Sequence, residues 1–169
     1  MRSLRFGVGL VVAIMLHVVV VRLFAEVAPA VDFFLVLALF NTIDGNLGAG
    51  LLGGLVAGLT ADALTGGLYG LHGFANTITS YGTAFASRRL VIQKAIGVML
   101  LFSLAAAVQQ AIIVGLRLLL LPEAALPTPS WIAARVATVG VLGFLGLALK
   151  GRFIKGAENW RRNRTARLR

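Results

Sequence analysis

The chain is dominated by apolar segments that are long enough to cross a lipid bilayer. Residues 6–21 and 95–116 contain no charged side chain, and a spanning helix takes about 20 predominantly apolar residues. Hydrophobic residues make up 59% of the 169 positions and charged residues only 13%, whereas soluble domains average about 25% charged residues. We therefore predict an all-α integral membrane protein.

Polar and glycine-rich breaks divide the sequence into six predicted spans. The spans form one membrane domain, residues 1–150, which a basic tail follows, residues 151–169. In the second span the apolar part, residues 33–43, is short for a crossing, so a thin, tilted or re-entrant segment is the alternative there. The six spans cover approximately residues 6–25, 30–44, 47–65, 71–87, 95–121 and 131–149.

The distribution of positive charge predicts the orientation. If all six segments cross, one side receives the eight Lys and Arg residues of 150–169 together with Arg2, Arg5, Arg88, Arg89 and Lys94. The other side receives only Arg22, Arg117 and Arg135. Because positive loops stay in the cytoplasm, we expect both termini to lie there. If the short second segment did not cross, the N-terminus and the loop at Arg88 would lie on opposite sides of the membrane. The same count of positive charges therefore argues that this segment does cross.

A ladder of small residues marks the third span. Gly50, Gly54 and Gly58 recur every four residues, and Asp62 takes the next place in the same register. At about 100° per residue, Gly54, Gly58 and Asp62 fall within about 80° on one helix face. Such a small-xxx-small surface allows a close helix crossing. We expect it to pack within this chain, with a partner's helix as the alternative.

A tight turn, residues 66–70, follows the ladder and predicts a hairpin that brings Tyr69, His72 and Asn76 near Asp62. One interpretation is a brace, in which backbone N–H groups of the turn and a neighbouring His or Tyr hold the carboxylate. The alternative is an ion, proton or ligand site, since a carboxylate within a span is a functional candidate. We favour the brace because we expect no second buried carboxylate to face Asp62. The remaining acids of that side are assigned to span ends or loops on the outer rim: Glu26, Asp32 and Glu123.

The composition excludes several kinds of chemistry. The chain has no cysteine and two histidines, so thiolate sites and His-based metal sites are not expected. The turn after the ladder lacks the Lys-Ser/Thr of a phosphate-binding loop, and we find no other enzymatic motif. We predict a protein that is not an enzyme and has neither cofactor nor metal.

The basic tail is interpreted as a membrane-surface anchor. Clustered basic residues can bind nucleic acid, but on a hydrophobic chain the anionic cytoplasmic leaflet is the favoured partner, at about 1 kcal/mol per basic residue. Membrane lipid and no nucleic acid are therefore expected, with a specific cytoplasmic protein as the alternative. The predicted anchor residues are Lys150, Arg152, Lys155, Trp160, Arg161 and Arg162.

Together these motifs resemble the rod shape-determining protein MreD family. The resemblance rests on the Pro-x-x-Asp of 29–32, the glycine ladder ending in Asp62, the Gly-Leu-x-Gly-Leu-His turn of 67–72, and Tyr81-Gly82 in a polar helix. It is densest over residues 45–89 and covers the whole chain by span count. The loop before the ladder departs from the family pattern, because it carries Asn41 and Asp44 rather than more basic residues.

The resemblance implies a non-enzymatic subunit of the cell-elongation complex in the bacterial inner membrane. Such a subunit would bind MreC through that protein's transmembrane helix. It would work with RodA and a class B penicillin-binding protein in lateral peptidoglycan synthesis. The family's fold is similar to the substrate-binding subunits of energy-coupling-factor transporters, six-helix bundles with an outward cavity. In that fold Asp62 and His72 would line or brace the cavity.

Two other functions stay open on the sequence. A vitamin-type solute-binding subunit would need an outward cavity, for which the candidates are Tyr69, His72, Asn76, Arg117 and Trp131. A lipid-handling or ion-coupled protein would use Asp62.

Overall fold

The computed structural model describes residues 2–66, 68–89, 95–121 and 127–166, with side chains for residues 3–149 of these ranges. Within them every regular element is helical, which confirms the predicted all-α class. The elements are α1 (Arg2–Leu23), the 3₁₀ turn η1 (Ala28–Ala30), α2 (Phe33–Phe40), α3 (Leu47–Thr65), α4 (Leu71–Arg89), α5 (Ala95–Leu120) and α6 (Pro129–Ala166).

Four of the described helices are long and apolar enough to cross a membrane: α1 over Ser3–Leu23, α3, α5, and α6 over Pro129–Leu149. η1 and α2 together form a shorter apolar stretch, Ala28–Phe40. The crossing of the membrane by α2 and α4 stays a prediction.

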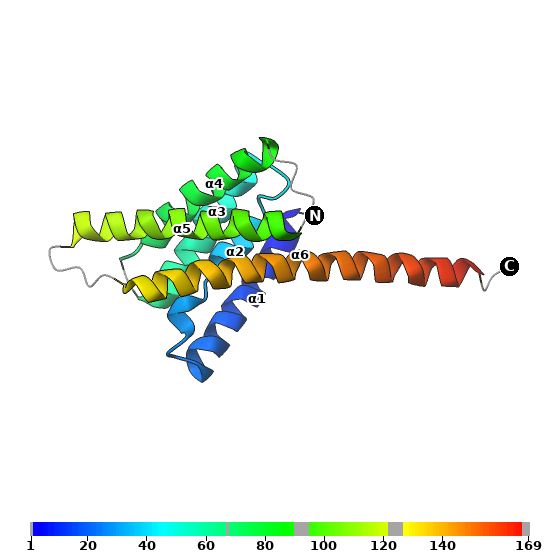
Figure 1. Cartoon of the computed structure of the whole chain (residues 1–169), viewed down its shortest axis with the longest axis horizontal. Helices are drawn as coiled ribbons and strands as arrows, with labels where there is room; N and C mark the ends of the chain where they lie inside the picture. The colour runs from blue at the N-terminus through cyan, green and yellow to red at the C-terminus, as the bar shows by residue number, and fades with distance from the viewer. Residues whose placement is uncertain (1, 67, 90–94, 122–126, 167–169) are drawn as a thin grey trace.

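The short helix α2 lies in the middle of the bundle (Figure 1). It contacts each of the other five α-helices, and Phe34, Leu35, Ala38 and Leu39 are buried in these contacts. Asp32 caps its N-terminus, while Pro29 belongs to the preceding η1 turn. Neighbouring helices therefore surround much of α2.

Two apolar clusters hold the helices together around α2. Leu35 and Leu39 pack with Phe102 of α5 and Val139 of α6. On the other side of α2, Phe34 belongs to a cluster that reaches α1 and α3 through small residues. The small partners are Ala13, Ala57 and Ala61.

The glycine ladder of α3 packs against α4 of the same chain. A Cβ atom at Gly50 would lie 2.9 Å from the carbonyl oxygen of Ser80, and one at Gly54 would lie 2.5 Å from that of Asn76. At Gly58 the nearest atom would be the carbonyl oxygen of His72. Only glycine allows the two backbones to approach this closely. Gly66, with a φ of 65°, then ends α3 in the left-handed conformation.

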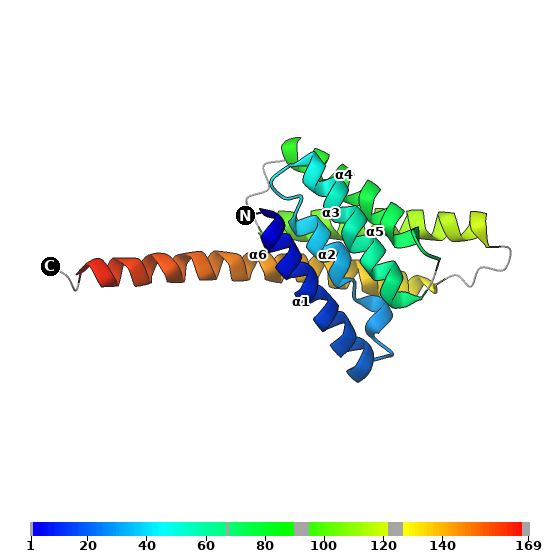
Figure 2. The same cartoon turned by 180° about the vertical axis from the view of Figure 1, so that it is seen from behind.

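α6 continues as one helix from Pro129 to Ala166. Its C-terminal half projects from the bundle at the end where the N-terminus lies (Figures 1 and 2). The side chains of the predicted membrane anchor, Lys150, Arg152, Lys155, Trp160, Arg161 and Arg162, lie outside the described residues.

Candidate functional site

Asp62, near the end of α3, accepts hydrogen bonds from the start of α4. Its Oδ2 lies 2.9 Å from the backbone nitrogens of both Gly70 and Gly73. Its Oδ1 lies 3.0 Å from the backbone nitrogen and 2.8 Å from Nδ1 of His72. The first N–H groups of a helix have no partner within that helix. Asp62 therefore caps α4 from the neighbouring helix.

This geometry joins two of the predicted hairpin residues and separates the others. Asp62 and His72 are in contact, whereas the side chain of Tyr69 is 72% exposed and makes none of these hydrogen bonds. Asn76 is buried and interacts with Gln109 instead. A carboxylate has about four acceptor positions, and the four contacts occupy them at Asp62. The arrangement is that of a brace.

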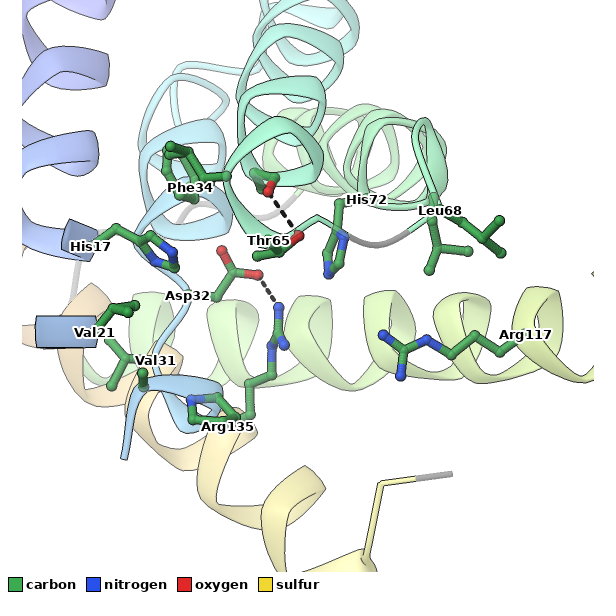
Figure 3. A pocket seen from close by; sticks show the side chains of 15 residues that line it. His17, Val21, Val31, Asp32, Phe34, Thr65, Leu68, His72, Arg117 and Arg135 are labelled. Atoms are coloured by element: carbon green, nitrogen blue, oxygen red, sulfur yellow. Dashed lines mark hydrogen bonds and ion pairs between the residues drawn. The ribbon is translucent and has the colours of Figure 1, made fainter. Parts of the chain in front are cut away.

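Asp32 is a second buried carboxylate, 4% exposed. Its Oδ1 accepts a hydrogen bond from the backbone nitrogen of Leu35 at 2.8 Å. Its Oδ2 accepts one from Nε2 of Gln109 at 3.0 Å. The same oxygen forms an ion pair with Nη2 of Arg135 (Figure 3). Asp32 therefore stands at the start of its predicted span, as expected, but it is buried rather than exposed on the outer rim. The reason is that α5 and α6 close over the start of α2.

A polar network extends from Asp32 across the bundle. The Nε2 group of Gln109 is shared between Asp32 and Oδ1 of Asn76, which lies 2.7 Å away. Thr138 of α6 donates a hydrogen bond to the carbonyl oxygen of Ala30. Because an unsatisfied polar group in an apolar environment costs several kcal/mol, this network fixes how α2, α4, α5 and α6 are placed against one another.

A chamber lies beside the Asp32–Arg135 pair. It consists of one pocket of about 410 Å³ and a second of about 400 Å³. Both are lined by Pro29, His72, Arg117 and Arg135, and we call them together the basic chamber. Figure 3 shows Arg135 extending from α6 to Asp32, with Arg117 farther along the wall on α5.

The comparison with family models identifies the chain. Residues 2–125 match the model described as rod shape-determining protein MreD. The chain belongs to the MreD family. Neither the curated proteins nor the solved structures give a match.

Membership of the MreD family confirms the resemblance found in the sequence motifs, and it implies a role in rod-shape determination. MreD proteins are shape-determining membrane proteins and are not known as an enzyme family. With four long apolar helices, this MreD family member is a multi-pass membrane protein. The matched range contains Asp32, Asp62, His72 and Gln109, whereas Arg135 lies beyond it.

Sequence reasoning missed the residues that meet at Asp32. Gln109 and Gln110 stand out as amides within an apolar run, and Arg135 as a charge inside the last predicted span. An intramembrane arginine requires a partner, and Arg135 is therefore the stronger of these two signals. It does not identify the partner, because Asp32 and Arg135 are separated by 103 positions.

Proposed function

We propose that this MreD family member is a non-enzymatic subunit of the bacterial cell-elongation complex in the plasma (inner) membrane, with both termini in the cytoplasm. It binds MreC and, with RodA and a class B penicillin-binding protein, supports lateral peptidoglycan synthesis and cell shape. The observation that carries the proposal is the MreD match over residues 2–125. The internal hydrogen bonding of Asp62 and Asp32 supports structural rather than catalytic roles for both carboxylates.

The outward face of α1 is the surface that we propose for the transmembrane helix of MreC. One edge of α1, with Ala13 buried at its centre, packs on the bundle (Figure 2). The opposite edge presents apolar side chains at helical spacing, which suit a second helix. These are Val8, Val12, Met15 and Val19, between 48% and 64% exposed.

Co-purification tests the proposal directly. We would express the full chain with MreC and measure how much MreC a tag on this chain retains from solubilised membranes. The unaltered chain should retain MreC, together with RodA and the penicillin-binding protein. If no MreC is retained, the proposal is wrong.

A pair of matched variants then locates the surface. Val8→Trp with Met15→Trp alters the outward edge of α1, whereas Leu100→Trp with Leu104→Trp alters an equally exposed apolar edge of α5. The α1 variant should lose MreC and the α5 variant should keep it. The reverse result would assign the contact to α5 and leave the function unchanged.

The basic chamber favours one alternative, a vitamin-type solute-binding subunit of a transporter. Three of its candidate residues, His72, Arg117 and Trp131, line one pocket of the chamber. Tyr69 and Asn76 line neither pocket. A thermal shift of the purified protein with a member of a vitamin panel would support this alternative, and the absence of any shift would argue against it.

A further inference from the structure

The basic chamber contains a positive charge that the described part of the chain does not pair. Arg135 is neutralised by Asp32. Arg117, half-buried on α5, lines both pockets, and its guanidinium forms no ion pair or hydrogen bond within the described ranges. A charge held at the end of a membrane bundle is stabilised by a counterion. The chamber therefore favours an anionic group beside Arg117.

Two further polar groups at the chamber lack a partner among the described residues. The side chain of Gln110 is only 6% exposed, lines the second pocket and has no hydrogen bond at Oε1. Nε of Arg135 is buried and unbonded, although the other side of the guanidinium pairs with Asp32. Buried polar atoms are rarely left unsatisfied in native proteins. Arg117 and Arg135 would donate to an oxyanion, whereas the free Oε1 of Gln110 is an acceptor and would take a hydrogen bond from a hydroxyl or ammonium group of the same ligand.

The surroundings of these groups are apolar. Leu64 and Leu68 line the first pocket, and Trp131 lines the second. Each is between 40% and 42% exposed, so each presents apolar surface to whatever occupies the opening. A ligand that fits both parts has a charged head and a hydrocarbon body. Glu26, exposed on the wall of the second pocket, disfavours a multiply charged anion and favours a phosphodiester, which carries a single negative charge.

We propose that the basic chamber binds a phosphate group, with Arg117 and Arg135 as its cationic donors and Gln110 as a further polar contact. The apolar rim favours a phospholipid headgroup as the source of that phosphate, and a soluble phosphate ester shares the same chemistry. Arginine suits this ligand because its planar guanidinium matches phosphate oxygens in bidentate geometry. This site is independent of MreC binding and can fail without affecting the proposed function.

Native mass spectrometry of the full chain in detergent tests the proposal. The probes are phosphatidylethanolamine, diacylglycerol of the same acyl chains, and glycerol 3-phosphate. We expect the phospholipid to bind and diacylglycerol to bind at least about tenfold more weakly, because one charge-assisted contact is worth roughly that factor. Equal binding of the phospholipid and diacylglycerol would overturn the proposal, since the phosphate would then contribute nothing.

Matched arginine variants provide the second readout. Arg117→Gln should weaken phospholipid binding about tenfold, and Arg117→Lys should restore part of it. Arg22→Gln, an exposed arginine that lines neither pocket, should leave binding unchanged. Equal losses in the Arg117 and Arg22 variants would overturn the site, because they would indicate a general surface attraction.

The remaining experiments distinguish a phospholipid from a soluble phosphate ester as the ligand, and they control for misfolding of the variants. Displacement of the phospholipid by glycerol 3-phosphate, dependent on Arg117, would support a site for soluble phosphate, and resistance to it would support the lipid. Gln110→Leu keeps a similar volume, so it should fold normally and still bind phospholipid more weakly. If Gln110→Leu and Arg117→Gln both fold with unaltered thermal stability and bind like the unaltered chain, the proposal is wrong.

Discussion

Asp62 and Asp32 are both buried carboxylates, and their partners differ in kind. Asp62 is held mostly by backbone N–H groups of Gly70 and of the first residues of α4. Asp32 is held by one backbone group and by the side chains of Gln109 and Arg135, which come from two distant helices. The first arrangement closes a local hairpin, whereas the second ties together elements from across the chain.

The comparison shows two ways in which a membrane protein fixes its helices. In the α3–α4 hairpin, glycines bring the backbones together and a carboxylate caps the returning helix, so side-chain chemistry matters at a single position. Around α2, larger side chains separate the helices, and polar side chains of different helices must hydrogen-bond or form ion pairs with one another. Substitutions should therefore destabilise the α3–α4 hairpin through steric clashes. Around α2 they should destabilise the protein through the loss of a charged partner.

The largest loss of stability is expected at the glycine ladder, where the backbones of α3 and α4 are in close contact. Gly58→Leu places a side chain against the backbone of His72 and Gly73, and neither backbone can move without breaking the cap at Asp62. We expect the fold to be lost, because a clash with two segments of backbone exceeds the usual overpacking cost of about 1–3 kcal/mol. The measurement is the yield of monodisperse protein after detergent extraction. Gly82→Leu is the control, because nothing lies within 4 Å of a Cβ atom built at Gly82.

Removal of the charge at Asp32 should have the next largest effect. Asp32→Ala leaves Arg135 without its carboxylate, and breaking a buried pair in this way costs about 3–5 kcal/mol. Thermal unfolding in detergent is the measurement. The double variant Asp32→Ala with Arg135→Leu should be more stable than Asp32→Ala alone, because no unpaired charge remains. If the two losses add fully, the ion pair is not what stabilises this region.

Asp62→Asn should destabilise the protein less than Asp32→Ala does. The asparagine keeps one acceptor oxygen, so some of the N–H groups of α4 lose their partner but no charged side chain is stranded. We expect a loss of about 1–3 kcal/mol in the same unfolding assay. Arg135→Leu should not rescue this variant. Rescue would show that the two carboxylates belong to one network.

The smallest effect is expected at the His72 ring. His72→Ala removes the Nδ1 contact but leaves the backbone N–H bond to Asp62. We expect a loss of at most about 1 kcal/mol, the usual net value of one hydrogen bond, in the same unfolding assay. A loss as large as that of Asp62→Asn would show that the ring, rather than the backbone, holds the carboxylate.

The same contrast explains what could be predicted from the sequence. The all-α class follows from apolar runs. The approach of His72 to Asp62 follows from a four-residue repeat and a turn, all within about one hairpin. The burial of Asp32 could not be predicted, because it depends on how α5 and α6 pack over α2. Helical periodicity gives the face of each helix but not which faces meet, and Gln109 and Arg135 therefore had no assigned partner.

The unbroken helix α6 has a mechanical consequence. Arg135 near its start pairs with Asp32, and Ala166 at its far end lies about 46 Å away at about 1.5 Å per residue. α6 stays packed on the bundle as far as Gly146, where an added Cβ atom would meet the ring of Phe40. From Gly146 to Ala166 the helix runs on for about 30 Å, so a tilt of about 5° at Gly146 displaces its end by about 3 Å. Small changes in how α6 packs on Phe40 would therefore be magnified where the chain is most basic.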